Sequence, residues 1–94
     1  MPHYVYILRC GDGSYYVGHT ADLAERIVRH NAGRGPAYTV ARRPVEMAYS
    51  EALSSIDAAL QREAQLKRWT REKKEALIAG DTESLRLSAK RHRP

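Results

Sequence analysis

Five polar or aromatic side chains of this chain are candidates for a single chemical site. Two are tyrosines in neighbouring segments, two are basic residues at helical spacing and one is acidic: Tyr6, Tyr16, Arg26, His30 and Glu63. The 94 residues carry a formal net charge of +5, and a small basic domain has an electrostatic reason to meet phosphate-rich partners. Basic charge alone equally suits any soluble protein. The placement of these side chains therefore has to decide whether they form a chemical site.

Arg26 and His30 are four residues apart and therefore lie on one face of a helix. At ~100° per residue they lie beside Leu23 and Ile27, at the edge of an apolar stripe. A helix meets a sheet along such an edge, and a cleft can open there. The alternative interpretation is two ordinary basic residues that face solvent.

Glu63 is unusual because it falls where a helix should be apolar. It lies seven residues after Ile56, within about 20° of it on a helical wheel, in a sector whose apolar members are Ile56, Ala59, Leu60, Ala64 and Leu66. A buried carboxylate without a partner is costly, so Glu63 needs a cation or a cavity. One explanation is an ion pair with Lys67 on the next turn. The other is a metal ion, since one carboxylate with water and phosphate oxygens is a typical magnesium environment.

Three strands are expected to position these groups. Segments 4–10 and 15–19 are rich in aromatic and β-branched residues and flank the turn residues 11–14, which predicts a β-hairpin. Segment 44–50 alternates apolar and other residues and predicts a third strand. Its leading Pro44 suits an edge strand or the start of a strand.

Capping and stop residues predict the helices. They are expected from Thr20 or Asp22 to Gly33, from a capping box of Ser54 and Asp57 to about Trp69, over 70–79 before Gly80, and from Asp81 through Leu85 and Leu87. The basic segment 37–43 is predicted to be a loop. The order β-β-α-β-α-α indicates one α+β domain over residues 1–88, with helices packed against a small, mainly antiparallel sheet. The basic tail 89–94 is expected to be frayed.

The length of the hairpin loop decides whether the two tyrosines share a face. With a two-residue turn at Asp12-Gly13, Tyr6 pairs with His19 and the rings of Tyr6 and Tyr16 lie on opposite faces. With a three-residue loop ending in a left-handed Gly13, Tyr6 pairs with Gly18 and the rings share a face. The second register would leave room for a ligand beside Gly18. A purely structural alternative is that the tyrosines only pack the sheet.

The cysteine count and the N-terminus indicate the redox environment and the compartment in which the protein is expected. Cys10 is the only cysteine, which excludes an internal disulfide and a cysteine-based zinc site within one chain. The first residues lack the pattern of a signal peptide, and no apolar run approaches the ~20 residues that cross a membrane. We therefore expect a reduced, cytoplasmic protein with no membrane partner.

The candidate residues, taken in order, resemble the GIY-YIG nuclease superfamily, and most closely its small stand-alone bacterial members. Tyr4-Val5-Tyr6 stands where the family has Gly-Ile-Tyr, and Tyr16-Val17-Gly18 where it has Tyr-Ile-Gly. Segment 18–26 resembles the start of the family's first helix and ends at its arginine, and segment 58–67 resembles the segment with its metal-binding glutamate. The resemblance covers about residues 4–78. It departs from the family at Tyr4, which replaces a glycine, and at Asn31, the only asparagine, which comes earlier than the one some members use after the glutamate.

The resemblance implies a three-stranded antiparallel sheet flanked by helices and hydrolysis of DNA phosphodiester bonds with one divalent metal, Mg²⁺ or Mn²⁺. Glu63 would hold the metal, Arg26 would neutralise charge on the phosphate, and Tyr6 would act as or position the general base. Tyr16 and His30 would orient the water or the phosphate. A phenol has an ordinary pKa of ~10, so we expect Tyr6 to lie in a cationic pocket that lowers its pKa.

Substrate contacts are expected from Gly18, Lys67, Arg42 and Arg43. The competing interpretation is a non-catalytic nucleic-acid-binding module that retains the fold, for which a carboxylate at position 63 would be unfavourable because it repels phosphate. A protein partner for targeting, and a role in repair or recombination, are compatible with either. Single-stranded, duplex and branched DNA all stay open as substrates.

Overall fold

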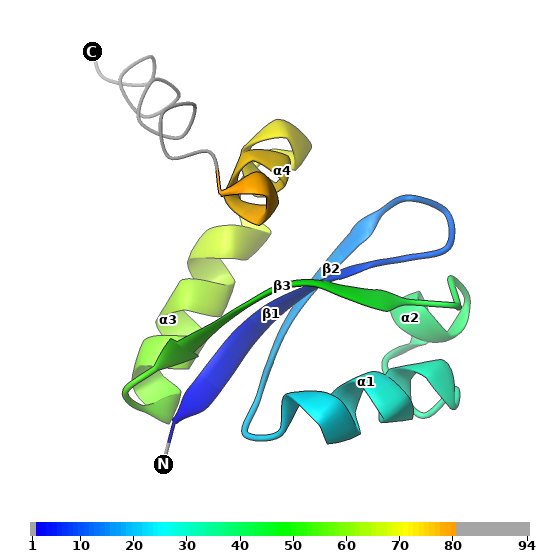
Figure 1. Cartoon of the computed structure of the whole chain (residues 1–94), viewed down its shortest axis with the longest axis horizontal. Helices are drawn as coiled ribbons and strands as arrows, with labels where there is room; N and C mark the ends of the chain where they lie inside the picture. The colour runs from blue at the N-terminus through cyan, green and yellow to red at the C-terminus, as the bar shows by residue number, and fades with distance from the viewer. Residues whose placement is uncertain (1, 81–94) are drawn as a thin grey trace.

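The computed structural model describes residues 2–80 and has a three-stranded antiparallel sheet with helices against both faces (Figure 1). The strands are β1 (His3–Arg9), β2 (Tyr15–Thr20) and β3 (Glu46–Leu53), in the spatial order β2-β1-β3. This is the expected α+β class and order of elements, with one additional short helix. The predicted last helix after Asp81 and the tail 89–94 lie outside the described residues. Within residues 2–80, no helix has the length and apolar character needed to span a membrane.

The hairpin β1–β2 has the three-residue loop. Gly13 has a φ of +84°, in the left-handed region, and its N–H donates to the Cys10 carbonyl at 2.9 Å. Tyr6 pairs with Gly18 and Leu8 with Tyr16, so the register is the one that places Tyr6 and Tyr16 on the same face. The condition for a shared tyrosine site is therefore confirmed.

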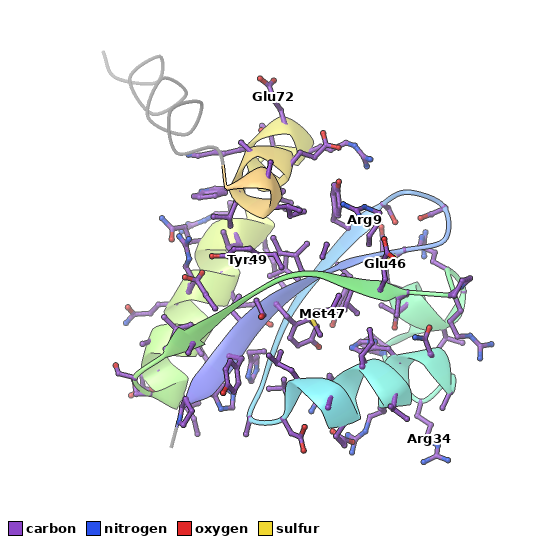
Figure 2. All side chains as sticks on the ribbon, in the orientation of Figure 1. Arg9, Arg34, Glu46, Met47, Tyr49 and Glu72 are labelled. Atoms are coloured by element: carbon purple, nitrogen blue, oxygen red, sulfur yellow. The ribbon has the colours of Figure 1, made fainter. Side chains whose placement is uncertain are left out.

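Strand β3 differs from the expected segment 44–50 at both ends and in its alternation. The backbone N–H and C=O of Val45 are bonded to the Asn31 side chain at 2.8 and 2.9 Å, so the ladder with β1 begins only at Glu46. A bulge lies opposite Ile7 and Leu8, where Tyr49 and Met47 pair and Ala48 is the extra residue. As a result Met47 and Tyr49, which a regular alternation puts on one side, pack on opposite sides of β3 (Figure 2).

Two helices cover one face of the sheet. Helix α1 (Leu23–Asn31) begins after Asp22, whose carboxylate accepts the Glu25 N–H at 3.0 Å as expected. A short helix, α2 (Ala37–Val40), occupies the segment that was predicted to be a loop. That prediction is wrong because the Pro36 carbonyl accepts the N–H groups of Thr39 and Val40, both at 3.0 Å, and so begins a helical turn.

The other face carries α3 (Ile56–Lys67) and α4 (Arg71–Ala79). The N-cap of α3 is Ser55, which accepts the Ala58 N–H at 3.1 Å, rather than the expected Ser54. Helix α3 also ends at Lys67, before the expected Trp69. Helix α4 ends at Gly80, whose φ of +74° is the predicted left-handed stop.

The two faces of β1 divide the core into two clusters. The cluster under α3 contains Val5, Ile7, Val17, Ala59 and Leu66, and the cluster beside α1 contains Tyr6, Leu8, Cys10 and Val45. Alternate residues of β1 thus supply both clusters, which is the period-2 pattern of a strand. Since β2 is an edge strand, groups from α1 and from α3 can meet along its open edge.

Candidate active site

Tyr6 is buried, and its phenol ring crosses β2 at Gly18. A Cβ atom on Gly18 would lie 2.5 Å from the Tyr6 hydroxyl oxygen and 2.6 Å from the ring carbon that bears it. The space beside Gly18 is therefore filled by the tyrosine, and the expectation that Gly18 leaves room for a ligand is wrong. Only a residue without a side chain lets the phenol pass over the strand toward α1.

A buried chain of hydrogen bonds continues from Tyr6 into α1 and α2. The Tyr6 hydroxyl lies 3.0 Å from His30 Nε2, and His30 Nδ1 lies 2.9 Å from Thr39 Oγ1. The Thr39 hydroxyl donates to the Pro36 carbonyl at 3.1 Å. His30 and Thr39 are both almost completely buried. The helical spacing that placed His30 on the inner edge of α1 is therefore confirmed, and the alternative of a solvent-facing histidine is excluded.

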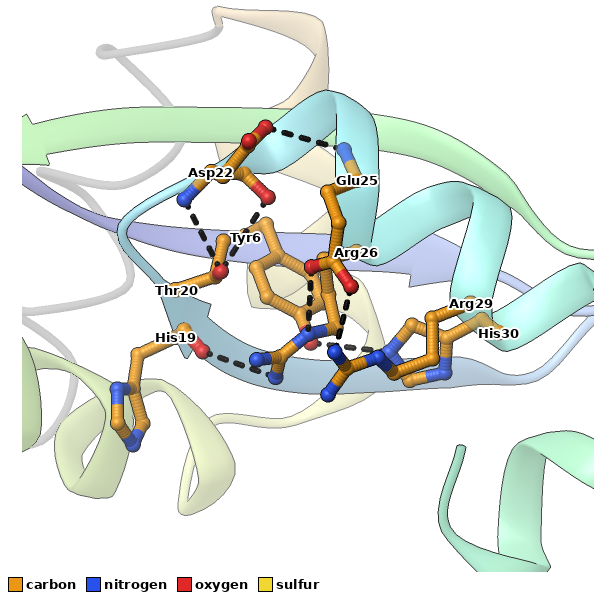
Figure 3. Close-up of polar contacts among 8 residues, drawn as sticks. All are labelled: Tyr6, His19, Thr20, Asp22, Glu25, Arg26, Arg29 and His30. Atoms are coloured by element: carbon orange, nitrogen blue, oxygen red, sulfur yellow. Dashed lines mark hydrogen bonds and ion pairs between the residues drawn. The ribbon is translucent and has the colours of Figure 1, made fainter. Parts of the chain in front are cut away.

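Arg26 lies one turn before His30 and faces the same phenol (Figure 3). Its Nη1 reaches the His19 carbonyl at 3.5 Å and its Nε lies 4.0 Å from a Glu25 carboxylate oxygen. The Nε is buried and has no hydrogen-bond partner among the described residues. A buried N–H without an acceptor is unfavourable. The guanidinium as a whole interacts with the Tyr6 hydroxyl, since hydrogen bonding and charge from Arg26 both lower the Tyr6 pKa.

The ionisation of these groups differs from what the sequence suggested. Burial is the largest influence and raises the pKa of Tyr6; hydrogen bonding and charge from Arg26 lower it, Tyr16 and Glu63 raise it, and the net shift of the pKa is upward. The expectation that a cationic pocket lowers the Tyr6 pKa is therefore wrong for the protein alone. Burial, and then the positive charges of Arg26 and Arg29, lower the pKa of His30 below its ordinary value of 6.5. His30 is thus a neutral imidazole at neutral pH, beside a protonated phenol.

Tyr16 lies on the other side of the His30 ring. Its ring is edge-on to His30 at a centroid distance of 5.6 Å and stacks on Tyr38 at 6.0 Å. Burial, followed by the charge of Glu63, raises the pKa of Tyr16. The tyrosines therefore do more than fill the sheet, because Tyr6 and Tyr16 both contact the buried His30.

Glu63 faces the tyrosines from α3, although not for the reason that the helical wheel gave. Ile56 and Leu60 are 58% and 43% exposed, so the buried face of α3 is centred on Ala59 and Leu66 instead. Glu63 lies about 40° from Ala59 and about 60° from Leu66 on the wheel, at the edge of this face, and its side chain is only 16% exposed. Its charge acts on both Tyr6 and Tyr16. The ion pair with Lys67 is present at 3.8 Å, a separation too long for a hydrogen bond.

The donor set suits a weakly held divalent ion. Among the described residues there is no group of three or more histidine, cysteine or acidic side chains that could enclose a metal. Mg²⁺ commonly keeps several waters and takes one or two carboxylates together with substrate phosphate oxygens. Glu63 fits this role, since it is the acidic group whose charge reaches both tyrosines.

The expected substrate contacts fall in different places. The guanidinium of Arg42 lies 3.8 Å above the Tyr38 ring and pairs with Asp12 at 3.0 Å, so it ties α2 to the hairpin loop. Arg43 is exposed, bonds the Val40 carbonyl at 3.0 Å and lines a surface hollow of about 520 Å³ that none of the five candidate residues lines. Lys67 is half-exposed beside Glu63. Of these three basic residues, only Lys67 contacts a candidate residue.

The sequence does not identify Thr39 and Tyr38 as site residues, because it predicts a loop over segment 37–43. A proline just before Ala37 was a signal for the start of a helix, since its fixed φ suits the first turn. Nothing in the sequence indicated that Thr39 contacts His30, because nine residues and a chain reversal separate them.

Known proteins similar to this chain match it over most of its length. A family model described as the GIY-YIG catalytic domain matches residues 2–76, which include all five candidate residues. The UPF0213 protein of Bacillus pumilus is 50% identical over 76 residues, 81% of this chain and 78% of the relative. The UPF0213 protein of Staphylococcus saprophyticus is 46% identical over 77 residues, 82% of this chain and 94% of the relative.

Two solution NMR structures share the fold. The UPF0213 protein BH0048 from Bacillus halodurans is 42% identical, with a TM-score of 0.56 over 86% of each chain. The protein EF2693 from E. faecalis is 36% identical, with a TM-score of 0.59 over 85% of each chain.

Proposed function

Because this chain belongs to the GIY-YIG catalytic domain family, a family of nucleases, we propose that it is a metal-dependent endonuclease that hydrolyses phosphodiester bonds in DNA. The observation that carries the proposal is the convergence of three kinds of group on one phenol. They are the buried imidazole of His30, the Arg26 guanidinium and the Glu63 carboxylate. The basic net charge of +5 suits binding to a phosphate backbone.

Tyr6 and His30 act together as the general base in this proposal. The raised pKa keeps Tyr6 protonated, so a free phenolate is not the resting base. As water gives its proton to the Tyr6 oxygen, the proton of the phenol passes to His30 Nε2. The water oxygen then bonds to phosphorus, and the bond to the leaving oxygen breaks with its electron pair on that oxygen. This transfer requires Nε2 to be the unprotonated nitrogen of His30.

Arg26 and Tyr16 hold the phosphate and the water in this proposal. The Arg26 guanidinium, whose side chain is 31% exposed, donates to a phosphate oxygen and offsets its developing charge. Tyr16, packed against His30, orients the water. Lys67 and Arg43 are the proposed contacts to the rest of the DNA backbone.

Glu63 is the residue that would hold Mg²⁺ or Mn²⁺, with water and phosphate oxygens as the other ligands. When bound, such an ion polarises the phosphate and offsets negative charge on it. Without an ion, the Glu63 carboxylate would repel the substrate, which argues against a module that only binds nucleic acid.

Cleavage assays with matched variants test the proposal. Single-stranded, duplex and branched DNA are incubated with Mg²⁺, Mn²⁺ or a chelator, for the wild type, Glu63→Gln and Glu72→Gln. Glu72 is an exposed acidic residue on α4, so its substitution makes the same change in charge away from the site (Figure 2). We expect cleavage that needs the metal, is lost in Glu63→Gln and is kept in Glu72→Gln.

The outcomes separate the two functional classes. Salt-sensitive binding without cleavage of any of the three DNA forms, under every metal condition, would reject the nuclease and favour the binding module. Cleavage that persists in Glu63→Gln and in chelator would reject the metal-binding role of Glu63 while leaving the nuclease in place.

A further inference from the structure

The hydrogen-bond chain from Tyr6 to Pro36 has a direction that its two ends determine. At the far end the Pro36 carbonyl oxygen can only accept, and the Thr39 hydroxyl lies 3.1 Å from it, placed to donate its single proton there. The Thr39 oxygen is then free to accept, and its neighbour at 2.9 Å is His30 Nδ1. With Thr39 donating to the carbonyl, the proton of the neutral imidazole lies on Nδ1, which leaves the lone pair on Nε2.

The near end of the chain requires the same direction. Arg26 beside Tyr6 is a donor only, so it cannot receive the phenol proton. Among the described residues, the hydrogen-bond partner of the Tyr6 hydroxyl is His30 Nε2, at 3.0 Å. If Nε2 carried the proton instead, the buried phenol would have no acceptor in the protein, which is costly. With the proton on Nδ1, each of the three donors in the chain has an acceptor.

The contact between His30 and Thr39 is closely enclosed. His30 and Thr39 are both buried, and the backbone of Gly35 closes over their contact. A Cβ atom on Gly35 would lie 2.6 Å from His30 Nδ1 and 2.9 Å from Thr39 Oγ1. The contact at 2.9 Å is direct and closely surrounded, so the threonine hydroxyl is the partner that Nδ1 has.

We propose that Thr39 is a positioning residue that holds His30 in the tautomer with the proton on Nδ1, so that Nε2 can receive the Tyr6 proton. The hydrogen bond from Nδ1 to Thr39 also stays in place when His30 becomes an imidazolium, since both nitrogens are then donors. The histidine therefore does not have to rotate during the transfer. The catalytic part of this inference rests on the proposed function; the tautomer itself does not.

The tautomer is measured directly by long-range ¹H–¹⁵N NMR correlation of the His30 ring, where protonated and bare nitrogens have distinct ¹⁵N shifts. The variants are Thr39→Val, which keeps the shape and removes the hydroxyl, and Thr39→Ser, which keeps the hydroxyl. We expect a protonated Nδ1 in the wild type and in Thr39→Ser. In Thr39→Val we expect the proton to move to Nε2 in at least part of the molecules.

Kinetics with the DNA form that the wild type cleaves test the consequence. General-base catalysis contributes roughly 10²–10⁴-fold, so loss of the correct tautomer in Thr39→Val should lower kcat by roughly 10–100-fold with KM unchanged. Thr39→Ser should restore kcat. A kcat loss that serine does not restore, or a rise in KM alone, would overturn the positioning role.

The experiments distinguish a wrong tautomer assignment from a wrong proposed function. A wild type with Nε2 protonated would overturn the inference whether or not the protein cleaves DNA, and even if Thr39→Val does not fold. A protein that cleaves nothing but shows a protonated Nδ1 that depends on Thr39 would instead reject the proposed function and keep the tautomer assignment.

Discussion

Gly18 offers the sharpest test of how Tyr6 is placed. In Gly18→Ala the new Cβ would lie 2.5 Å from the phenol oxygen, whereas ordinary contacts begin at 3.4 Å, so the ring must move by about 1 Å. Gly18 is not in the left-handed region, so its backbone accepts alanine. The displaced phenol can no longer keep its 3.0 Å hydrogen bond to His30.

The expected cost follows from these contacts. Overpacking typically costs about 1–3 kcal/mol and a lost hydrogen bond about 0.5–1.5 kcal/mol, and alanine returns about 0.4–1 kcal/mol by restricting the unfolded chain. We therefore expect Gly18→Ala to lower the free energy of unfolding by about 0.5–4 kcal/mol. Nuclease activity should fall by roughly 10²–10⁴-fold, because the general base is displaced.

A double-mutant cycle measured by urea unfolding isolates the clash. The ring atoms that the new Cβ would meet are the outer atoms of the phenol, and leucine has none of them. In a Tyr6→Leu background, Gly18→Ala should therefore change stability by less than about 1 kcal/mol. An equal cost in both backgrounds, or a stable and fully active Gly18→Ala, would refute the conclusion that Gly18 exists to admit Tyr6.

Two further predictions concern helix α1, which carries His30 and Asn31. The folded state holds the His30 pKa below 6.5 while the unfolded chain takes up a proton near 6.5, so the free energy of unfolding should fall as the pH drops below about 6.5 and should stop falling from this source below the folded pKa. Urea unfolding at pH 7.5 and 5.5 should show a smaller difference in His30→Gln than in the wild type; an undiminished difference would contradict the burial of a neutral His30. Asn31→Ala should lower stability by about 1–3 kcal/mol in thermal or urea unfolding, because it removes both bonds to the Val45 backbone. A cost below ~0.5 kcal/mol would show that Asn31 does not anchor the start of β3.

Residues close in sequence accounted for the features that were predicted correctly. The hairpin, the cap at Asp22 and the stop at Gly80 depend on turn and capping residues within a few positions of one another. The pairing of Arg26 and His30 on one helix face follows from a spacing of four. The prediction at α2 failed because the local signal of Pro36 was missed, whereas the alternation of β3 failed because its pairing with β1 decides where the bulge lies.

For the candidate site too, some features follow from the sequence and others depend on the folded structure. By itself the sequence determined which five side chains could meet and that the loop at Gly13 had to be long enough for two tyrosines to share a face. Only the tertiary structure decided that Tyr6 fills the space at Gly18, that burial outweighs Arg26 in setting the Tyr6 pKa, and that Thr39 completes the chain through His30. The physical reason is that periodicity and turn chemistry act between near neighbours, whereas desolvation and the partners of a buried polar atom depend on segments that meet only when the chain folds.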